Sequence, residues 1–168
     1  MAVTKYWVSK RCPSLVYEAL ECHGGNGYVE EGAMPRLYRE APLNAIWEGS
    51  GNVICLDVLR TLQKEPAALE GLHAEFNASS RLDSRLDTWV RRTREMLEDP
   101  RGLEVRGRQL VERLALALQA GLLLRHAPSP IAEAFCASRL GEEWGHAFGT
   151  LPPEVEVDAI LNRAAGGE

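Results

Sequence analysis

The spacing of apolar residues predicts a chain that is built from helices. Over residues 2–23, apolar side chains recur every three or four positions, as Val3 and Trp7 do. This is the period of a helix with one buried face. Pro13 lies inside the stretch and is expected to kink or split the helix, and the glycine-rich residues 24–27 are expected to end it.

Further helices are predicted along the rest of the chain, separated by breaks rich in proline, glycine and small polar residues. They cover residues 35–40, 50–65, 66–76, 81–98, 101–125, 131–144 and 152–163. The helix over 101–125 is expected to be the longest. Its second half, 114–124, is apolar nearly all round and is expected to be a central buried element. Because alternating β-branched runs are absent from the sequence, we predict an all-α helical bundle.

Composition narrows the classes of partner. Hydrophobic residues make up 45% of the 168 residues, enough for a core, and the formal net charge is −5. An acidic chain does not attract nucleic acid or an anionic membrane by its bulk charge. No stretch approaches the roughly 20 apolar residues of a membrane span, and we find no secretion signal. The chain begins directly in a helical pattern, without a cap or a leader, which is typical of a boundary inside a larger protein.

The cysteines indicate a reducing compartment. None of the four stands in a C-x-x-C pair, which excludes the zinc-ribbon and thioredoxin patterns. They lie in apolar contexts that are typical of buried thiols, and a cytoplasmic protein is the simplest interpretation. They are Cys12, Cys22, Cys55 and Cys136.

The segment 21–60 carries the candidate chemistry. Glycines cluster at 24–27, where they allow backbone N–H groups to approach a phosphate or simply end a helix. They do not complete a dinucleotide fingerprint, and no strand precedes them. Glu48 stands beside Trp47 at the start of a predicted helix. Its carboxylate is a candidate base, or it only favours the positive end of the helix dipole.

Four motifs, in one order and spacing, resemble the acyl-CoA dehydrogenase family, and within it the AidB-like (alkylation-response) subgroup. They are Glu21-Cys-His-Gly-Gly-Asn-Gly-Tyr28, Pro35-Arg-Leu-Tyr-Arg-Glu-Ala-Pro42, Ile46-Trp-Glu-Gly-Ser-Gly-Asn52 and Leu56-Asp-Val-Leu-Arg60. The resemblance implies two domains. Residues 1–66 would be the C-terminal part of the family's helical bundle, with its FAD and catalytic motifs, and 67–168 a helical extension of the AidB-like type.

The resemblance also implies roles for individual residues. Glu48 corresponds to the catalytic glutamate, which removes the α-proton of an acyl-CoA thioester while a hydride leaves the β-carbon for the flavin N5. The cofactor-binding residues that it implies are Ile46, Gly49, Ser50 and Asn52, with Gly24 and Gly25 placed against the FAD of a neighbouring subunit. Two residues depart from the family pattern, since Glu21 replaces a glutamine and Glu40 follows Arg39 in place of an aspartate.

Most of the family's other FAD and substrate contacts lie upstream of the matching segment. We therefore expect the isolated chain to be inactive and to bind FAD weakly or not at all. Family members are typically oligomers, so a homo-oligomer is expected. A helical oligomerisation module without chemistry of its own is an alternative function.

The sequence also raises a DNA-binding function and a metal site. AidB-like proteins are associated with DNA binding through their C-terminal helices, and a run of arginines here could contact phosphates. Acidic residues alternate with these arginines, as on a solvated helix face. The run comprises Arg81, Arg85, Arg91, Arg92 and Arg94. Two Glu-x-x-His pairs, 70–73 and 143–146, are similar to those of a di-iron bundle, but each contains a glycine and lies near a helix end, so no metal site is expected.

Overall fold

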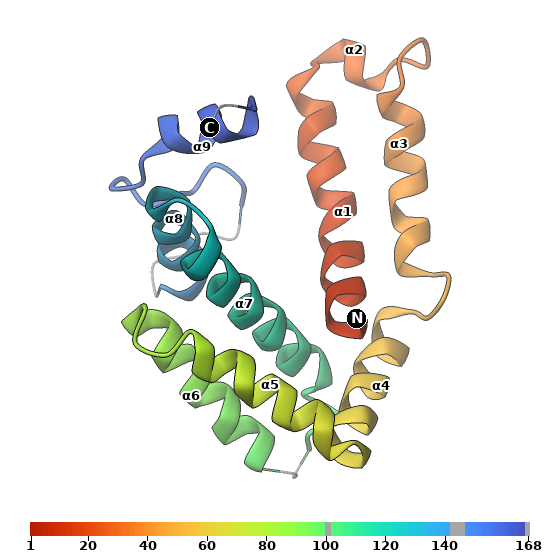
Figure 1. Ribbon diagram of the computed structural model, residues 1–168. Coiled ribbons are helices and arrows are strands. Elements are labelled where there is room, and N and C mark those ends of the chain that lie inside the picture. The colour runs from red at the N-terminus through yellow and green to blue at the C-terminus, as the bar shows by residue number, and fades with distance from the viewer. Residues whose placement is uncertain (100–101, 142–146, 167–168) are drawn as a thin grey trace. The chain divides into compact units, whose positions relative to one another are not determined.

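The computed structural model describes residues 1–99, 102–141 and 147–166, and every regular element in these ranges is a helix (Figure 1). This confirms the all-α prediction. The helices are α1 (Ala2–Cys22), α2 (Gly25–Tyr28), α3 (Met34–Glu40), the 3₁₀ helix η1 (Ala41–Ala45), α4 (Gly51–Lys64), α5 (Pro66–Ala78), α6 (Ser84–Glu98), α7 (Gly107–His126), α8 (Ser129–Leu140) and α9 (Val157–Ala164).

The chain divides into two compact units. Unit 1 comprises Met1–Lys64 and Gly102–Glu112, and unit 2 comprises Glu65–Arg101 and Arg113–Glu168. Residues 102–112, which the sequence placed in the second domain, therefore pack with unit 1. The division into domains at residue 66 stays a prediction.

Unit 1 is organised around α1, which packs against α3, η1 and α4. Figure 1 shows α1 and α3 side by side, with α2 at the end where the chain turns from one to the other. Apolar side chains from α1, η1, α4 and the segment 102–112 form its core. They include Tyr6, Ala41, Ile54, Cys55, Val58, Leu59, Leu103, Leu110 and Val111.

Pro13 does not split the first helix. α1 continues through it for 21 residues, which makes α1, and not the predicted 101–125 helix, the longer element. The missing N–H of Pro13 removes a single helical hydrogen bond, and packing on three neighbouring elements offsets that loss. α7 begins only at Gly107, because residues 103–106 form turns.

The glycine-rich segment is more ordered than a simple helix stop. Gly25–Tyr28 forms the short helix α2, and Gly27 is buried against the end of α1. A Cβ on Gly27 would collide with the carbonyl oxygen of Leu20. This close approach of two backbones requires glycine, so one of the four glycine-rich positions has a packing role.

Unit 2 has its own core, to which α5, α6, α7 and α8 contribute. The apolar stretch 114–124 is buried at 114–117 and at Ala120, but Leu122 near its end is 48% exposed. The prediction of a central buried helix is therefore correct for the first part of the stretch and wrong for its end. Other buried residues of unit 2 are Phe76, Leu86, Val90, Ala132, Ala134, Cys136 and Leu140.

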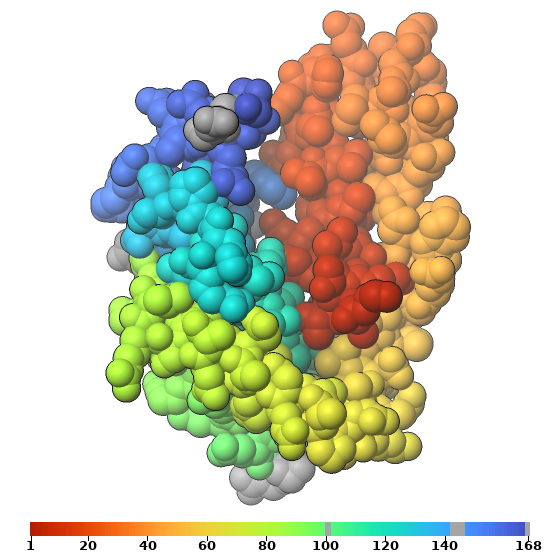
Figure 2. Space-filling model, viewed as in Figure 1, coloured from red at the N-terminus to blue at the C-terminus, as the bar shows by residue number. Residues whose placement is uncertain are grey.

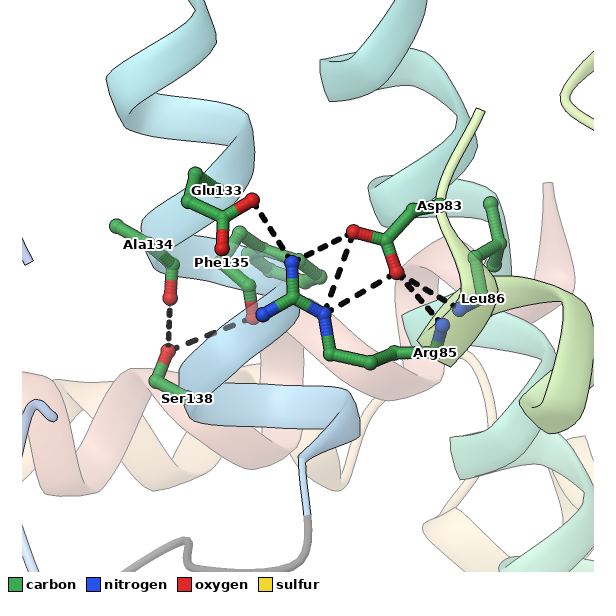
Figure 3. A network of polar contacts seen from close by, with 7 residues as sticks. All are labelled: Asp83, Arg85, Leu86, Glu133, Ala134, Phe135 and Ser138. Carbon is green, nitrogen blue, oxygen red and sulfur yellow. Dashed lines mark hydrogen bonds and ion pairs between the residues drawn. The ribbon is translucent and has the colours of Figure 1, made fainter. Parts of the chain in front are cut away.

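A network of charges joins α6 to α8 inside unit 2 (Figure 3). Asp83 caps α6, because its Oδ1 accepts hydrogen bonds from the backbone N–H groups of Arg85 (2.7 Å) and Leu86 (3.3 Å). The Arg85 Nη2 donates to Asp83 Oδ2 at 2.6 Å and to Glu133 Oε2 at 2.8 Å. Burial acts to raise the pKa of Asp83, but these hydrogen bonds together outweigh it and the pKa lies below its usual value. Close by on α8, burial raises the pKa of the Cys136 thiol to about 12.

The predicted burial of the cysteines is only partly correct. Cys55 and Cys136 are buried, Cys12 is half-buried and Cys22 is exposed, and all four are free thiols. Cys22 is the last residue of α1. Within the described ranges, none of the helices has the length and apolar character that a bilayer crossing requires. A cytoplasmic location stays a prediction.

Candidate functional site

Glu48 lies in a tight turn between η1 and α4. The turn begins where the N–H groups of Ile46 and Trp47 both donate to the carbonyl oxygen of Leu43, at 2.9 and 3.2 Å. The backbone of Glu48 then takes a left-handed conformation with φ +55°, and that of Gly49 has φ +111°. Such a conformation costs a residue with a Cβ about 1–2 kcal/mol. Strained backbone of this kind concentrates at functional sites.

Lys5 holds this turn from α1. Its Nζ donates to the carbonyl oxygen of Trp47 at 2.7 Å and to that of Gly49 at 3.0 Å. The side chains of Tyr6 and Lys10, also on α1, pack against Gly51 at the start of α4. The turn is therefore held from α1 on both sides of Glu48.

Two hollows in unit 1 share Glu48 and Lys5. The first has a volume of about 490 Å³ and opens over α4, where it is lined by Val53, Ile54, Leu56, Asp57 and Arg60. The second, of about 530 Å³, is lined from α1 by Thr4, Val8, Ser9 and Cys12, from η1 by Asn44 and from the turn by Trp47. Met1 also lines both hollows and is fully exposed. Figure 2 shows atoms of the N-terminal part of the chain, in red, at the surface.

Glu48 itself is exposed. Within the described residues, no hydrogen bond or ion pair engages it, including with Lys5. Its side chain is therefore free to meet a ligand. The surrounding turn is apolar but open, with Ile46 66% exposed and Trp47 56% exposed.

Four of the predicted FAD-binding residues lie around Glu48. Ile46 and Gly49 belong to the turn, Ser50 directly precedes α4, and Asn52 is in its first turn. The Asn52 side chain is already engaged, because Arg108 Nε donates to its Oδ1 at 2.6 Å. The first N–H groups of a helix have no partner within the helix, so the start of α4 offers donors beside Glu48.

The other two predicted FAD-binding residues lie at the opposite end of α1. Gly24 (φ +57°) precedes α2 and Gly25 is its first residue. At 1.5 Å per residue, α1 separates them from the Glu48 turn by about 30 Å. A Cβ at either glycine would have no other atom within 4 Å, so both face open space. The structure does not bring the two sets together within one chain.

A third hollow, of about 630 Å³, lies at the Gly24 end of unit 1, between α1 and α3. Tyr17 and Tyr38 meet across it with their ring centroids 5.9 Å apart. Arg39, the arginine of the second motif, forms a two-pronged ion pair with Glu30 at 2.6 and 3.0 Å. The hydrogen bonds from Arg39 lower the pKa of Glu30.

The arginine run that raised the possibility of DNA binding belongs to unit 2, and several of its members have partners. Arg85 is held by Asp83 and Glu133, and Arg91 pairs with Glu95 at 2.7 Å. Arg94 donates to Asn77 at 2.8 Å and lies over the ring of Phe76. These contacts are typical of a solvated, internally paired helix face. DNA binding stays a prediction without support from the contacts.

Glu70 and His73 lie on α5, whereas the second pair, 143–146, falls outside the described residues. In the part of the chain that the structure describes, no three His, Cys, Asp or Glu side chains gather as metal ligands would. The expectation that the chain holds no metal stays a prediction.

Sequence reasoning missed Lys5, Tyr6, Lys10 and Arg108. The first three lie close together on α1. The sequence pattern of this helix indicates only that one of its faces is buried. Arg108 lies 56 residues from Asn52. No local pattern links these residues to Glu48, since only the packing of distant segments brings them to the turn.

Part of the chain matches a known protein family, and several known proteins are similar to it in sequence. Residues 1–63 match the family described as acyl-CoA dehydrogenase, C-terminal domain. AidB of Escherichia coli (strain K12) is 40% identical over 97% of this chain and 29% of its own length. Acyl-CoA dehydrogenase family member 11 of Caenorhabditis elegans is 47% identical over 34% of this chain and 9% of that protein. Mitochondrial isovaleryl-CoA dehydrogenase of Arabidopsis thaliana is 37% identical over 34% of this chain and 14% of that protein.

The chain therefore spans less than a third of the length of each of these relatives. The similarity to AidB covers both units, whereas the other two matches are confined to segments of 57 and 58 residues. Residues 1–63 therefore belong to the acyl-CoA dehydrogenase family, as its C-terminal domain, and the similarity to AidB extends over 97% of the chain.

Proposed function

We propose that this chain is the C-terminal helical part of an FAD-dependent acyl-CoA dehydrogenase-like flavoprotein, and that Glu48 is its catalytic base. The observation that carries the proposal is the turn 46–50, where an unengaged carboxylate stands on strained, left-handed backbone between two hollows. A carboxylate with no structural partner, held at a cost in backbone energy, is typical of a functional residue. The reaction is αβ-dehydrogenation of an acyl-CoA thioester.

The role of Glu48 is to remove the α-proton of the acyl group. An exposed carboxylate is a weak base, and exclusion of water would strengthen it. The apolar side chains of Ile46 and Trp47 flank Glu48 and are themselves exposed in this chain. We infer that bound substrate, cofactor and further protein cover all three together, so that the base becomes desolvated only in the assembled enzyme.

The residues at the start of α4 fit a role in holding FAD. The backbone of Gly49 and Ser50 lies beside the first N–H groups of α4, which have no acceptor within the helix itself, and helix N-termini favour phosphate and other anionic groups. When bound, FAD supplies the acceptor for the hydride that leaves the β-carbon. Gly24 and Gly25 lie about 30 Å away along α1, which fits contact with the FAD of a second copy.

Exposed apolar side chains support both an assembled enzyme and a homo-oligomer. A monomeric protein seldom leaves large apolar areas uncovered. Unit 1 exposes such side chains on α1, on η1, on the Glu48 turn and on α4. They are Val8, Leu15, Leu43, Ile46, Trp47, Val53 and Leu56, each at least 41% exposed. We propose that other segments of a longer chain and a second copy cover them.

The test uses the full-length flavoprotein and its Glu48→Gln variant. Anaerobic reduction of the flavin is followed by absorbance after mixing with butyryl-, isovaleryl- or palmitoyl-CoA. We expect the variant to bind FAD normally and to reduce it about 10²- to 10⁴-fold more slowly, the usual contribution of a general base. The matched control is Glu65→Gln, which makes the same change at another exposed carboxylate beside a helix start and should leave the rate unchanged.

Equal rates of flavin reduction in wild type and Glu48→Gln would remove Glu48 from the base role. The 168-residue chain alone should be purified without a flavin spectrum and should not oxidise acyl-CoA, because the turn and its hollows are open to water. Turnover by the isolated chain would contradict the assembled-enzyme interpretation.

A further inference from the structure

Lys5 is the one side chain seen to bond the backbone on both sides of Glu48 in the described part of the chain. Its ammonium group donates to the carbonyl oxygen of Trp47 at 2.7 Å and to that of Gly49 at 3.0 Å. These carbonyls belong to the peptide groups that flank Glu48 and Gly49. Hydrogen bonds from a charged donor are about twice as strong as neutral ones. Lys5 therefore restrains the rotation of both peptide groups.

The restraint acts where the backbone is strained. Glu48 has φ +55°, a conformation that a residue with a Cβ leaves readily unless its surroundings hold it. If the Trp47 carbonyl rotated away, Glu48 could relax towards a right-handed conformation, and its Cα–Cβ bond would then point in another direction. The two hydrogen bonds from Lys5 oppose this relaxation.

Lys5 is held in position by the helix that carries it. Lys5 is half-buried on α1, which packs along η1 and α4. The neighbouring Tyr6 and Lys10 contact Gly51, where α4 begins. The turn is thus fixed to α1 at Trp47, Gly49 and Gly51, and not only through its own ends.

The ammonium group does not neutralise the carboxylate. Although Lys5 and Glu48 line the same two hollows, no ion pair joins them in the described residues. The donors of Lys5 are directed to the two carbonyl oxygens. Lys5 can therefore orient Glu48 and leave its carboxylate available to accept a proton.

We infer that Lys5 is a positioning residue for Glu48, which holds the strained turn so that the carboxylate faces the substrate; this inference rests on the proposed function. Misplacement of a reacting group by about 1 Å can cost about 100-fold in rate. Loss of Lys5 should therefore reduce turnover strongly while the carboxylate, the cofactor site and the fold remain.

The test uses the full-length flavoprotein with FAD bound and the one of butyryl-, isovaleryl- and palmitoyl-CoA that wild type oxidises fastest. Lys5→Met keeps the length of the side chain and removes its donors. We expect kcat to fall about 10- to 100-fold, with KM and FAD content within about twofold of wild type. Lys5→Arg, which retains donors, should recover most of the loss. Lys64→Met, the matched change at an exposed lysine at the far end of α4, should behave as wild type.

Three results would overturn the inference: a wild-type kcat in Lys5→Met, a loss seen only in KM or FAD content, or a Lys5→Arg variant as slow as Lys5→Met. If Lys5→Met does not fold, Lys5→Gln takes its place with the same criteria, because its side chain stays polar but is too short to hold both carbonyl oxygens. Glu48→Gln is measured alongside. A slow Glu48→Gln with a fast Lys5→Met rejects the inference alone, whereas a fast Glu48→Gln, or a wild type that oxidises none of the three, rejects the proposed function and the inference with it.

Discussion

The Glu48 turn of unit 1 and the Asp83–Arg85–Glu133 network of unit 2 use charged residues in opposite ways. In the network, the Asp83 side chain is only 8% exposed, and it accepts hydrogen bonds from two backbone N–H groups and from Arg85. In the turn, the Glu48 carboxylate is exposed and without a partner in the described residues, and its backbone is left-handed. The network therefore stabilises the fold, because its charged groups have partners. The turn lowers stability and leaves the Glu48 carboxylate available to a ligand.

The largest effect should come from breaking the network. Arg85→Met keeps an unbranched side chain but leaves the Asp83 carboxylate buried without its cation. Removing one partner of a buried pair costs about 3–5 kcal/mol. Because Arg85 is 29% exposed, we expect a smaller loss of about 2–3 kcal/mol in the free energy of unfolding. Urea denaturation at pH 7 measures it, and a loss below about 0.5 kcal/mol, the size of a surface effect, would show that the network contributes little to stability.

A second prediction concerns the pH dependence of the network. The pKa of Asp83 lies below its usual value in the folded chain, so the folded state holds the ionised form more strongly than the unfolded state. This stabilisation is complete at neutral pH and is lost as pH falls from about 5, through the unfolded pKa of about 3.9, to the lower folded pKa.

Asp83→Asn isolates this contribution. Asparagine still caps the helix but cannot pair with Arg85, so the variant should lose about 1.5 kcal/mol at pH 7, the value of a hydrogen bond to a charged group. Urea denaturation from pH 7 to pH 2.5 should show the gap between wild type and variant closing as pH falls. A gap that is constant over this range would contradict the assignment.

Replacement of Glu48 should have a different effect, because a suitable residue in the turn is expected to raise stability and not to lower it. Glu48→Gly and Glu48→Ala both remove the carboxylate, but only glycine accepts φ +55° without a steric cost. We expect Glu48→Gly to be about 1 kcal/mol more stable than Glu48→Ala, and no less stable than wild type. Thermal and urea denaturation of the three proteins provide the comparison. An alanine variant as stable as the glycine variant would mean that the turn is not strained.

The fold could be predicted from sequence where the helical period and the helix stops are local. The all-α class, and the helices later seen as α4, α5 and α6, follow from apolar spacing and flanking prolines. Prediction from the sequence was wrong where tertiary packing determines the bounds of a helix. α1 continues through Pro13, and Gly25–Tyr28 folds into a helix because Gly27 fits closely against Leu20.

The candidate site divides in the same manner. Glu48 and the proposed site residues beside it in the turn could be located through motifs, because they are contiguous in the sequence. The groups that hold the turn could not, since Lys5 lies 42 residues before Trp47 and its helix carries no sign of a polar role. The strain at Glu48 is likewise invisible in sequence, because glutamate has no preference for left-handed backbone.

The smallest change in the free energy of unfolding should come from the exposed ion pair between Arg91 and Glu95. Arg91 and Glu95 lie one turn apart on α6 at 2.7 Å, but their side chains are 61% and 58% exposed. Water and salt screen such a pair, and the side chains lose entropy when they pair. Arg91→Met should therefore change the free energy of unfolding by no more than about 0.5 kcal/mol, although it removes the same cation as Arg85→Met from the same helix.

Measuring both variants in urea at low and high salt tests the reason for the difference. The Arg91 effect should vanish at high salt, and the Arg85 effect should largely remain. Equal losses in the two variants would mean that burial of Asp83 is not what gives the network its stability.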